Sequence, residues 1–288
     1  FSTLPTANIQ NRRLGIAFAS YLLGIPNNST VLLQYKDGSK FRWSAYTAFL
    51  QDDYRVNNRL TLNLGVRWEA ETPRSEVNNR QSVFNLGTLQ LDYAGKDGNP
   101  KVLHNRNSKN FAPRAGFAYT LTGDGRTVVR GAYGLFYLAV NTTQGRTDFT
   151  TGPWSRSYSY TSLDNGVTFP VTLRNGLPPM SFNDPFTISL LTGGSWIDRD
   201  HPTAYMQQWT FNLQRDIGAD TVLEAGYVGT KGTHLGLDYD LNQIHPSLLG
   251  PNSGQSSRPY PTVGGITAIG AAVGNSTYHA LQVRFERR

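Results

Sequence analysis

The sequence predicts an all-β protein whose fold class is an antiparallel, up-and-down transmembrane β-barrel, incomplete in this chain. Three observations predict it: segments that alternate apolar and polar side chains, short turns that join these segments in pairs, and long loops between the pairs. Alternation over about ten residues is long for a soluble strand but fits a tilted membrane strand. We expect about seven or eight spanning strands, which would form an open curved sheet.

The composition supports a β-rich chain. Of 288 residues, 12% are aromatic, 16% are charged and 29 are glycine. Aromatic side chains suit pleated surfaces and glycine suits turns. A mean hydropathy of −0.41, and no apolar run near 18 residues, argue against helical membrane spans. They leave a β-barrel open, because only alternate residues of its strands meet lipid.

The charge and cysteine content narrow the possible partners. A net charge of +7 permits nucleic-acid binding, but the basic residues are scattered, with no cluster longer than Arg12-Arg13 and Arg287-Arg288. We therefore expect a generic basic surface and no nucleic-acid partner. The absence of cysteine excludes a disulfide scaffold and Cys-ligated metals. No cofactor is expected.

The first predicted hairpin joins residues 41–56 to residues 60–70 through Asn57-Asn58, a pair that tolerates the positive φ of a tight turn. Alternation is complete in the second of these strands, where the even positions are apolar. The outward face of the first strand stays open, because two adjacent aspartates interrupt both of its phases.

The second predicted hairpin surrounds the turn Gly123-Asp124-Gly125. If the turn centres on Asp124, Phe117 lies opposite Gly131, and an aromatic ring covers a glycine across the strand pair. A third hairpin has its turn at 218–220, and a last strand at 278–288 has no partner after it.

The connections between hairpins are predicted to be long, at 72–109, 139–203 and 231–275. Short turns on one side and long loops on the other are typical of outer-membrane barrels. The first loop is expected to hold small extra strands within 82–93. Residues 16–24 could form a short helix or a strand.

The alternation divides the strand residues into two candidate surfaces. The candidates for the lipid-facing surface or its aromatic girdle are Leu62, Leu64, Trp68, Phe117, Tyr119, Leu135, Tyr137, Trp209, Phe211, Leu223 and Tyr227. The lumen-facing candidates are Arg67, Glu69, Arg114, Arg130, Gln208, Asn212 and Glu224. Two structural alternatives stay open: a hydrogen-bond and ion-pair lattice that stiffens the wall, and aromatic packing in the core of a soluble sheet.

Several short segments contain residues that could bind a cation or take part in catalysis, but none of them requires such a role. Asp198, Asp200 and His201 could bind a cation, but a structural or solvated role is favoured. His234 follows a strand in a glycine-rich string and is interpreted as a loop residue. The adjacent Asp52 and Asp53 would point to opposite faces of a strand, whereas an acid/base pair needs both carboxyls in one cleft. With no catalytic motif in view, we expect no enzyme.

Five strings, in order, resemble the Oar-like branch of TonB-dependent outer-membrane receptors. They cover about a third of the chain and lie mostly on the predicted strands and turns. The strings are FASYLLGIP (18–26), FLQDDYRVNNRLTLNLGVRWE (49–69), NFAPRAGFAYTLTGDGRTVVRGAYGLFY (110–137), YMQQWTFNLQRDIGADTVLEAGYVGTKGTHL (205–235) and YHALQVRFERR (278–288).

The resemblance implies a barrel wall in the outer membrane of a Gram-negative cell, in contact with lipid. It also implies an N-terminal plug through which the TonB complex energises movement of a bulky, unidentified solute. The chain departs from the family in lacking a plug, a TonB box and a terminal aromatic strand. We therefore interpret residues 1–288 as a partial receptor barrel domain, an internal fragment whose sheet edges would be unpaired.

Two other classes of function stay open. The first is a secreted, soluble β-sandwich or propeller that binds carbohydrate through loop aromatics such as Trp154 and Trp196. The second is a glycoside hydrolase, which the absence of a convincing carboxylate pair weakens. Apolar faces that converge on a shared core would favour the soluble alternatives.

Overall fold

The computed structural model of the chain describes residues 1–7, 14–36, 39–138, 152–162, 168–181, 184–187 and 193–287. The chain divides into two compact units. Unit 1 comprises Phe1–Ser39 and Phe149–Ser189, and unit 2 comprises Lys40–Asp148 and Leu190–Arg288. All of the long strands fall in unit 2.

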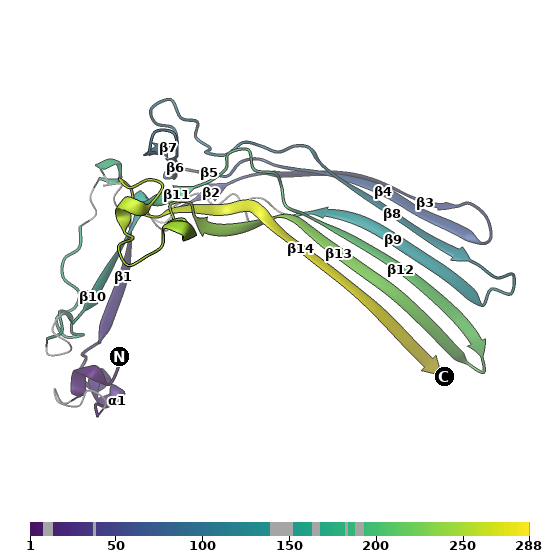
Figure 1. The fold of residues 1–288 in the computed structure, drawn as a ribbon, viewed down its shortest axis with the longest axis horizontal. Helices are drawn as coiled ribbons and strands as arrows, with labels where there is room; N and C mark the ends of the chain where they lie inside the picture. The colour runs from purple at the N-terminus through teal and green to yellow at the C-terminus, as the bar shows by residue number, and fades with distance from the viewer. Residues whose placement is uncertain are drawn as a thin grey trace. The chain divides into compact units, whose positions relative to one another are not determined.

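The main element of unit 2 is an eight-stranded sheet in the order β11-β14-β13-β12-β9-β8-β4-β3 (Figure 1). Its seven long strands are antiparallel neighbours in chain order, and only the short β11 (Gly194–Trp196) is parallel to β14. The long strands are β3 (Ala45–Arg55), β4 (Leu60–Glu71), β8 (Asn110–Thr120), β9 (Thr127–Tyr137), β12 (Tyr205–Gly218), β13 (Thr221–Asp240) and β14 (Ile266–Arg287). The predicted all-β, antiparallel, up-and-down sheet is confirmed.

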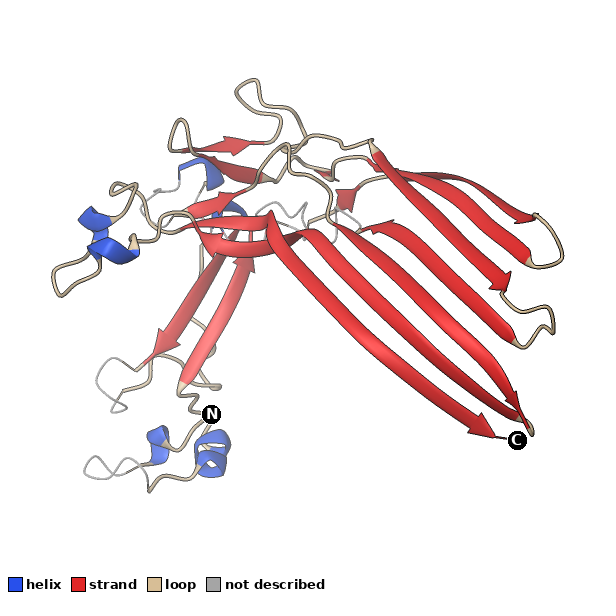
Figure 2. Cartoon of the chain, turned by 45° about the vertical axis from the view of Figure 1, so that its right-hand side comes forward, coloured by secondary structure: helices blue, strands red, loops and turns tan. Residues whose placement is uncertain are grey.

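The long strands form a single curved layer (Figure 2). Along β3 every residue is exposed, which requires that neither face of this strand be covered in the described part of the chain. Apolar side chains inside the sheet are exposed as well: Leu64, Phe211 and Leu223 keep 49%, 51% and 40% of their accessible surface. A β-sandwich would bury such side chains between two sheets. The soluble-sandwich alternative is therefore not supported.

The short turns lie where they were predicted, but the first turn is held by a side-chain hydrogen bond and not by residues with positive φ. Neither Asn57 nor Asn58 has a positive φ. Instead, the side-chain oxygen of Asn57 accepts hydrogen bonds from the N–H groups of Arg59 and Leu60, at 2.8 and 3.0 Å. The asparagine thus acts as an Asx turn, which its short polar side chain also permits. In the third hairpin, Ala219 and Asp220 both adopt positive φ.

Two strand boundaries differ from the prediction. The strand predicted at 41–56 is interrupted, because its first two residues form β2 (Phe41–Arg42), which pairs with β5 (Ser75–Glu76). The loop predicted at 231–275 is strand at both of its ends, because β13 continues to Asp240 and β14 begins at Ile266. Three register shifts interrupt this extension and obscure its periodicity.

The buried core of unit 2 lies in the long connections and not on the face of the sheet. The hairpin of β6 (Ser82–Asn85) and β7 (Gln90–Tyr93) confirms the extra strands predicted within 82–93. Its Phe84 packs with Val263 and Ile266, all 3% exposed or less. Small 3-10 helices complete the last connection, η5 (Pro246–Leu248) and η6 (Gln255–Ser257).

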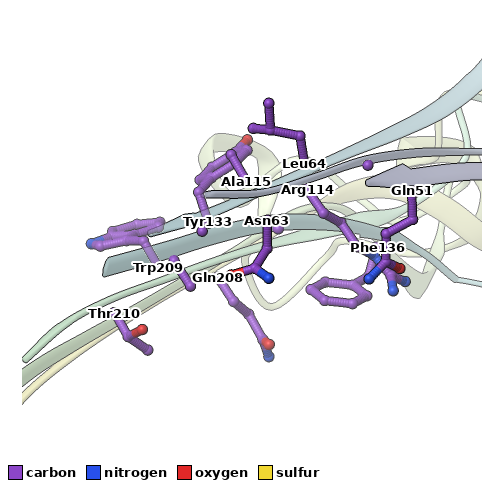
Figure 3. Close-up of a pocket in the computed structure, with 14 residues that line it drawn as sticks. Gln51, Asn63, Leu64, Arg114, Ala115, Tyr133, Phe136, Gln208, Trp209 and Thr210 are labelled. Atoms are coloured by element: carbon purple, nitrogen blue, oxygen red, sulfur yellow. The ribbon is translucent and has the colours of Figure 1, made fainter. Parts of the chain in front are cut away.

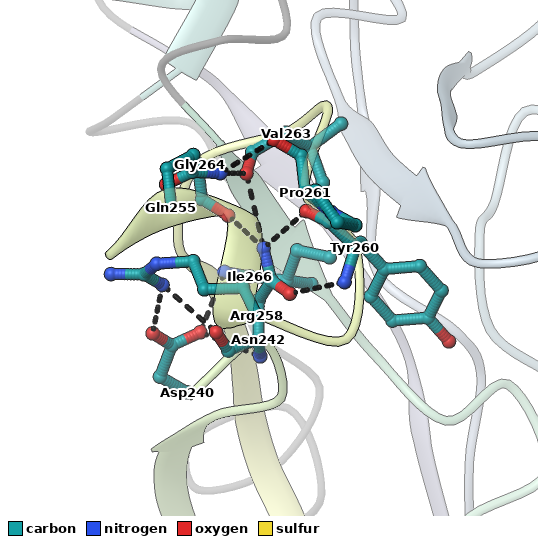
Figure 4. A network of polar contacts seen from close by, with 9 residues as sticks. All are labelled: Asp240, Asn242, Gln255, Arg258, Tyr260, Pro261, Val263, Gly264 and Ile266. Carbon is teal, nitrogen blue, oxygen red and sulfur yellow. Dashed lines mark hydrogen bonds and ion pairs between the residues drawn. The ribbon is translucent and has the colours of Figure 1, made fainter. Parts of the chain in front are cut away.

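A buried asparagine closes that last connection (Figure 4). The Asn242 side chain is fully buried, and its amide donates hydrogen bonds to the carbonyls of Tyr260, Val263 and Gly264, at 2.7 to 3.1 Å. Arg258 bridges the Asp240 carboxylate and the Asn242 carbonyl. Because buried carbonyls need donors, this one amide fixes the return of the chain into β14.

Unit 1 contains η1 (Leu4–Thr6), α1 (Ala17–Leu22), η2 (Gly152–Trp154), η3 (Pro185–Thr187) and the antiparallel pair β1 (Asn28–Gln34) and β10 (Ser155–Thr161). The segment left open at 16–24 is therefore a short helix. Trp154 is 3% exposed and packs against Tyr35 and Phe186, with ring centres 6.0 and 5.7 Å apart. A buried indole cannot stack on a sugar, and Trp196 likewise packs beside the Phe84 cluster.

A buried ion pair holds the start of the first long connection. The Glu76 carboxylate accepts hydrogen bonds from the Arg80 guanidinium at 2.9 Å and from the N–H groups of Lys40, Asn78 and Arg80. Burial alone raises the pKa of Glu76, but these hydrogen bonds outweigh it and hold the pKa below its ordinary value of 4.5.

This connection should open in acid. A carboxyl whose pKa is lowered by folding contributes stability that is present above its ordinary pKa and is lost as the pH falls through its folded pKa. The protection factors of residues 76–80 against hydrogen exchange should therefore fall below about pH 4.5. In Glu76→Gln these protection factors should be low at neutral pH and nearly independent of pH. Equal acid sensitivity in both proteins would contradict this role.

Candidate functional site

Strand register sorts the predicted residues into two faces of the sheet. Residues paired across antiparallel strands share a face, so one row runs from Leu64 through Ala115, Tyr133 and Trp209 to Gly229. All eleven lipid-facing or girdle candidates stand in rows of this face, here called the apolar face. All seven lumen-facing candidates stand on the opposite one, here called the polar face. Which medium each face contacts stays a prediction.

The same register settles the strand whose phase was left open. Tyr46, Ala48 and Leu50 of β3 stand on the apolar face, opposite Ala70, Trp68 and Val66. The two adjacent aspartates point to opposite faces, as predicted. Asp52 stands beside Leu64, while Asp53 accepts a 2.5 Å hydrogen bond from the Asn63 amide on the polar face. They form no acid/base pair.

Aromatic rings cover glycines on the apolar face. Phe117 stands opposite Gly131, as predicted, and a Cβ on that glycine would lie 2.4 Å from the ring. Trp209 covers Gly229 in the same way, at 2.3 Å. Beside it, the Tyr227 ring stacks on His279. The glycines make room for large rings to lie flat along the sheet, where cross-strand aromatic contacts stabilise it.

Part of the polar face forms hydrogen bonds and ion pairs of the kind expected for a lattice that stiffens the wall. Arg67 pairs with Glu69 along β4. Arg130 donates a 2.6 Å hydrogen bond to Gln214 across β9 and β12. Asn212 lies over Gly226, and Glu224 stands between Gln214 and Arg284 in register. Such exposed pairs are worth little individually but hold long side chains in place.

A hollow of about 390 Å³ lies among the central strands (Figure 3). Its floor is made of small residues, since Gly65, Gly116 and Gly134 stand on the polar face of β4, β8 and β9. In the close-up, Leu64 points to the other side of the sheet from Phe136 and Gln208. The polar-face side chains around the hollow are Gln51, Asn63, Arg114, Phe136, Gln208 and Thr210.

Arg114 is the charged residue of this hollow. Its guanidinium lies 4.8 Å from the centre of the Phe136 ring, and that ring covers Gly134. In the described part of the chain no carboxylate lies within ion-pair distance of Arg114. The hollow is thus positively charged, with an aromatic wall. Phe136 was not predicted here, although it shares the even-numbered phase of Arg130.

The loop residues considered for chemistry have structural partners. His201 is 8% exposed, and its Nδ1 lies 2.8 Å from the Asp198 carbonyl, while Asp200 accepts a hydrogen bond from Asn105. No group of three His, Cys, Asp or Glu side chains among the described residues could hold a metal ion. His234 was wrongly interpreted as a loop residue. It lies within β13, at a bulge where its φ is +57°.

Within the described ranges, no helix has the length and apolar character needed to cross a membrane.

The fold and its two faces define a class, the wall of a membrane-spanning β-sheet with one apolar and one polar surface. A family model described as "Outer membrane beta barrel domain" matches residues 1–288, the whole chain. The chain therefore belongs to this family of outer-membrane β-barrels, and its location is the outer membrane. No curated protein matches it.

The covered glycines make a direct test of the apolar face. Gly131→Ala should destabilise the sheet by about 1–3 kcal/mol, because the new methyl group collides with the Phe117 ring. Gly116→Ala is the matched control, since its Cβ would meet nothing nearer than 3.6 Å. The control should be neutral or gain up to about 1 kcal/mol. Urea unfolding from detergent micelles measures both, and Phe117→Leu should relieve the first variant. Equal effects in both variants would refute the ring contact.

Proposed function

We propose that this chain is part of the wall of a TonB-dependent receptor of the Oar-like branch, which moves a bulky solute across the outer membrane. The apolar face meets lipid, the polar face lines the lumen, and the long connections take part in solute recognition. Membership of the outer-membrane barrel family supports the wall, while the five resembling strings support the TonB-dependent class. The chain itself has no catalytic role in this proposal.

The observation that carries the lipid contact is a slanted apolar band. On β3 the band is Tyr46, Ala48 and Leu50, before Asp52. On β14 it is Leu281, Val283 and Phe285, after His279. The register row of Ala48 crosses β4 at Trp68, whereas the row of Val283 crosses it at Leu60. The band therefore shifts by eight residues from one edge of the sheet to the other.

The size of this shift corresponds to the strand tilt of a membrane β-barrel. Eight residues rise about 27 Å along a strand, and the six spacings from β3 to β14 span about 29 Å across the sheet. A band that is level in the membrane then requires strands tilted by roughly 43°. Membrane barrels tilt their strands by about 35–45°.

Aromatic residues lie towards both ends of this band. Tyr137 lies towards the long connections, and Tyr54 and Tyr119 lie towards the short turns. Such amphipathic rings favour the headgroup region of a bilayer. They support the same placement of the membrane.

The hollow supports a lumen that contacts other groups. Small floor residues let a bulky group approach the backbone, and the Arg114 guanidinium favours carbonyl or anionic groups. Whether a solute or another part of the receptor occupies it, the same chemistry applies. Its position on the polar face is what a lumen contact requires.

The slanted band predicts how deep individual residues lie in the bilayer. Residues 1–288 contain no cysteine, so single Ala48→Cys, Val283→Cys and Leu60→Cys variants of the full-length protein, with any cysteine outside this range replaced by serine, can carry one nitroxide label each. In liposomes, the labels at 48 and 283 should lie at the same depth near the bilayer centre. The label at 60 should lie near the headgroups, although it shares a register row with 283.

Collision with oxygen and with a nickel chelate measures both depth and face. A label at Thr210→Cys, on the polar face, should collide more with the water-soluble chelate than any of the three. If labels at 60 and 283 report equal depths, the strands stand upright and the slanted band is wrong. If the label at 210 collides mostly with oxygen, the two faces are exchanged.

The TonB-dependent class needs a separate test. The full-length protein, extracted in detergent from its own outer membrane, should bind the purified periplasmic domain of TonB from the same cells. Heat-denatured receptor serves as the control. Absence of binding while the depth pattern holds would leave the barrel wall standing and remove the TonB-dependent function.

A further inference from the structure

We propose that His104 and His201 form a binding site for a transition-metal dication of the zinc class, and that the metal joins two connections of unit 2. His104 belongs to the connection between β7 and β8, and His201 to the segment between β11 and β12. Both side chains line one small cavity. The site lies outside the sheet and is independent of the transport proposal.

Hydrogen bonds to backbone carbonyls fix the tautomer of each ring. The Nδ1 of His104 lies 3.3 Å from the Asn105 carbonyl, and the Nδ1 of His201 lies 2.8 Å from the Asp198 carbonyl. A carbonyl can only accept, so each Nδ1 carries the proton and each Nε2 keeps a lone pair. A hydrogen bond from the second ring nitrogen to a backbone carbonyl is the usual support of a metal-binding histidine.

The Nε2 atom of each ring is buried. His104 is 4% exposed and His201 is 8% exposed, and neither Nε2 atom has a hydrogen-bond partner among the described residues. Leaving a buried acceptor unsatisfied costs about 1–3 kcal/mol. Two such acceptors at one small cavity therefore indicate a missing partner. An electron-pair acceptor satisfies both at once.

The distance between the two rings also fits one shared ion, because the ring centres are 6.0 Å apart. A metal bonded to Nε2 at about 2.0–2.1 Å lies about 3.2 Å from the ring centre, so two rings on one ion can be at most about 6.4 Å apart. The cavity has about 10 Å³ for the centre of a water-sized sphere, which is room for one small occupant.

The surrounding contacts hold the two segments in this arrangement. Asn105 donates from its backbone to the Arg199 carbonyl at 2.7 Å and from its side chain to Asp200 at 2.6 Å. Asn107 donates to Thr203 at 3.0 Å. Because these contacts do not involve the imidazole nitrogens, the pair is already assembled before any ligand arrives.

The donor set selects the class of ion. Imidazole suits zinc, copper and nickel, whereas magnesium and calcium prefer oxygen ligands. Since no third His, Cys, Asp or Glu of the described residues completes the group, water would supply the remaining ligands. A single bridging water is the competing occupant, because it could donate to both lone pairs.

Zinc titration of the full-length protein separates these occupants. The protein is folded in detergent micelles, freed of metal with a chelator and titrated calorimetrically with Zn²⁺. One saturable site is expected, and His104→Ala and His201→Ala should each weaken it at least tenfold. His245→Ala is the matched control, because this histidine is exposed, its side chain hydrogen bonds to Ser247, and its loss should leave binding unchanged.

A measurement on the unaltered protein guards against variants that fail to fold. Loaded with one equivalent of Cu²⁺, the protein should show two imidazole nitrogens in its electron spin-echo spectrum. Calcium should not compete for the site. Absence of saturable zinc binding, which is the outcome for a bridging water, would overturn the proposal. Binding that survives in both His104→Ala and His201→Ala, or that is lost in His245→Ala, would overturn it too.

Discussion

The constraint on which this structure depends is that one layer of strands must satisfy its backbone and still present two chemically opposite surfaces. In hydrocarbon no water can bond to free N–H and C=O groups, so neighbouring strands must supply every partner. Antiparallel pairing does this for the strands inside the sheet, and it also aligns side chains of like phase into rows. The two faces, the slanted band and the hollow all follow from those rows.

In the long connections of the same chain, apolar side chains are buried against one another, whereas on the long strands they are exposed. There the apolar side chains of β6 and of the last connection converge, and Phe84 and Ile266 are buried as in a soluble domain. Some polar groups are buried with them and paired, as Asn242 and Glu76 show. The contrast is physical, because connections in water gain from hiding apolar surface, whereas strands in lipid gain nothing from it.

The features that could be predicted from the sequence are those set by residues close to one another in the chain. Period-two alternation and turn residues are read within ten residues, so the hairpins, both faces and the Phe117–Gly131 pair were predictable. The far part of β13 was missed because bulges shift its phase near His234. The cation–π contact of Arg114 and the approach of His104 to His201 were missed for another reason. Each joins residues that only the folded register brings together.

The two edge strands of the sheet show what its stability in a bilayer requires. Among the described strands, β3 pairs only with β4, and β14 beyond its short contact with β11 pairs only with β13. Both edges carry the apolar band, at Leu50 and at Leu281, which are 74% and 75% exposed. An unpaired edge at that depth would leave a row of backbone groups in hydrocarbon, each costing several kcal/mol. A sheet with this band is therefore stable in a bilayer only where further strands pair with both edges.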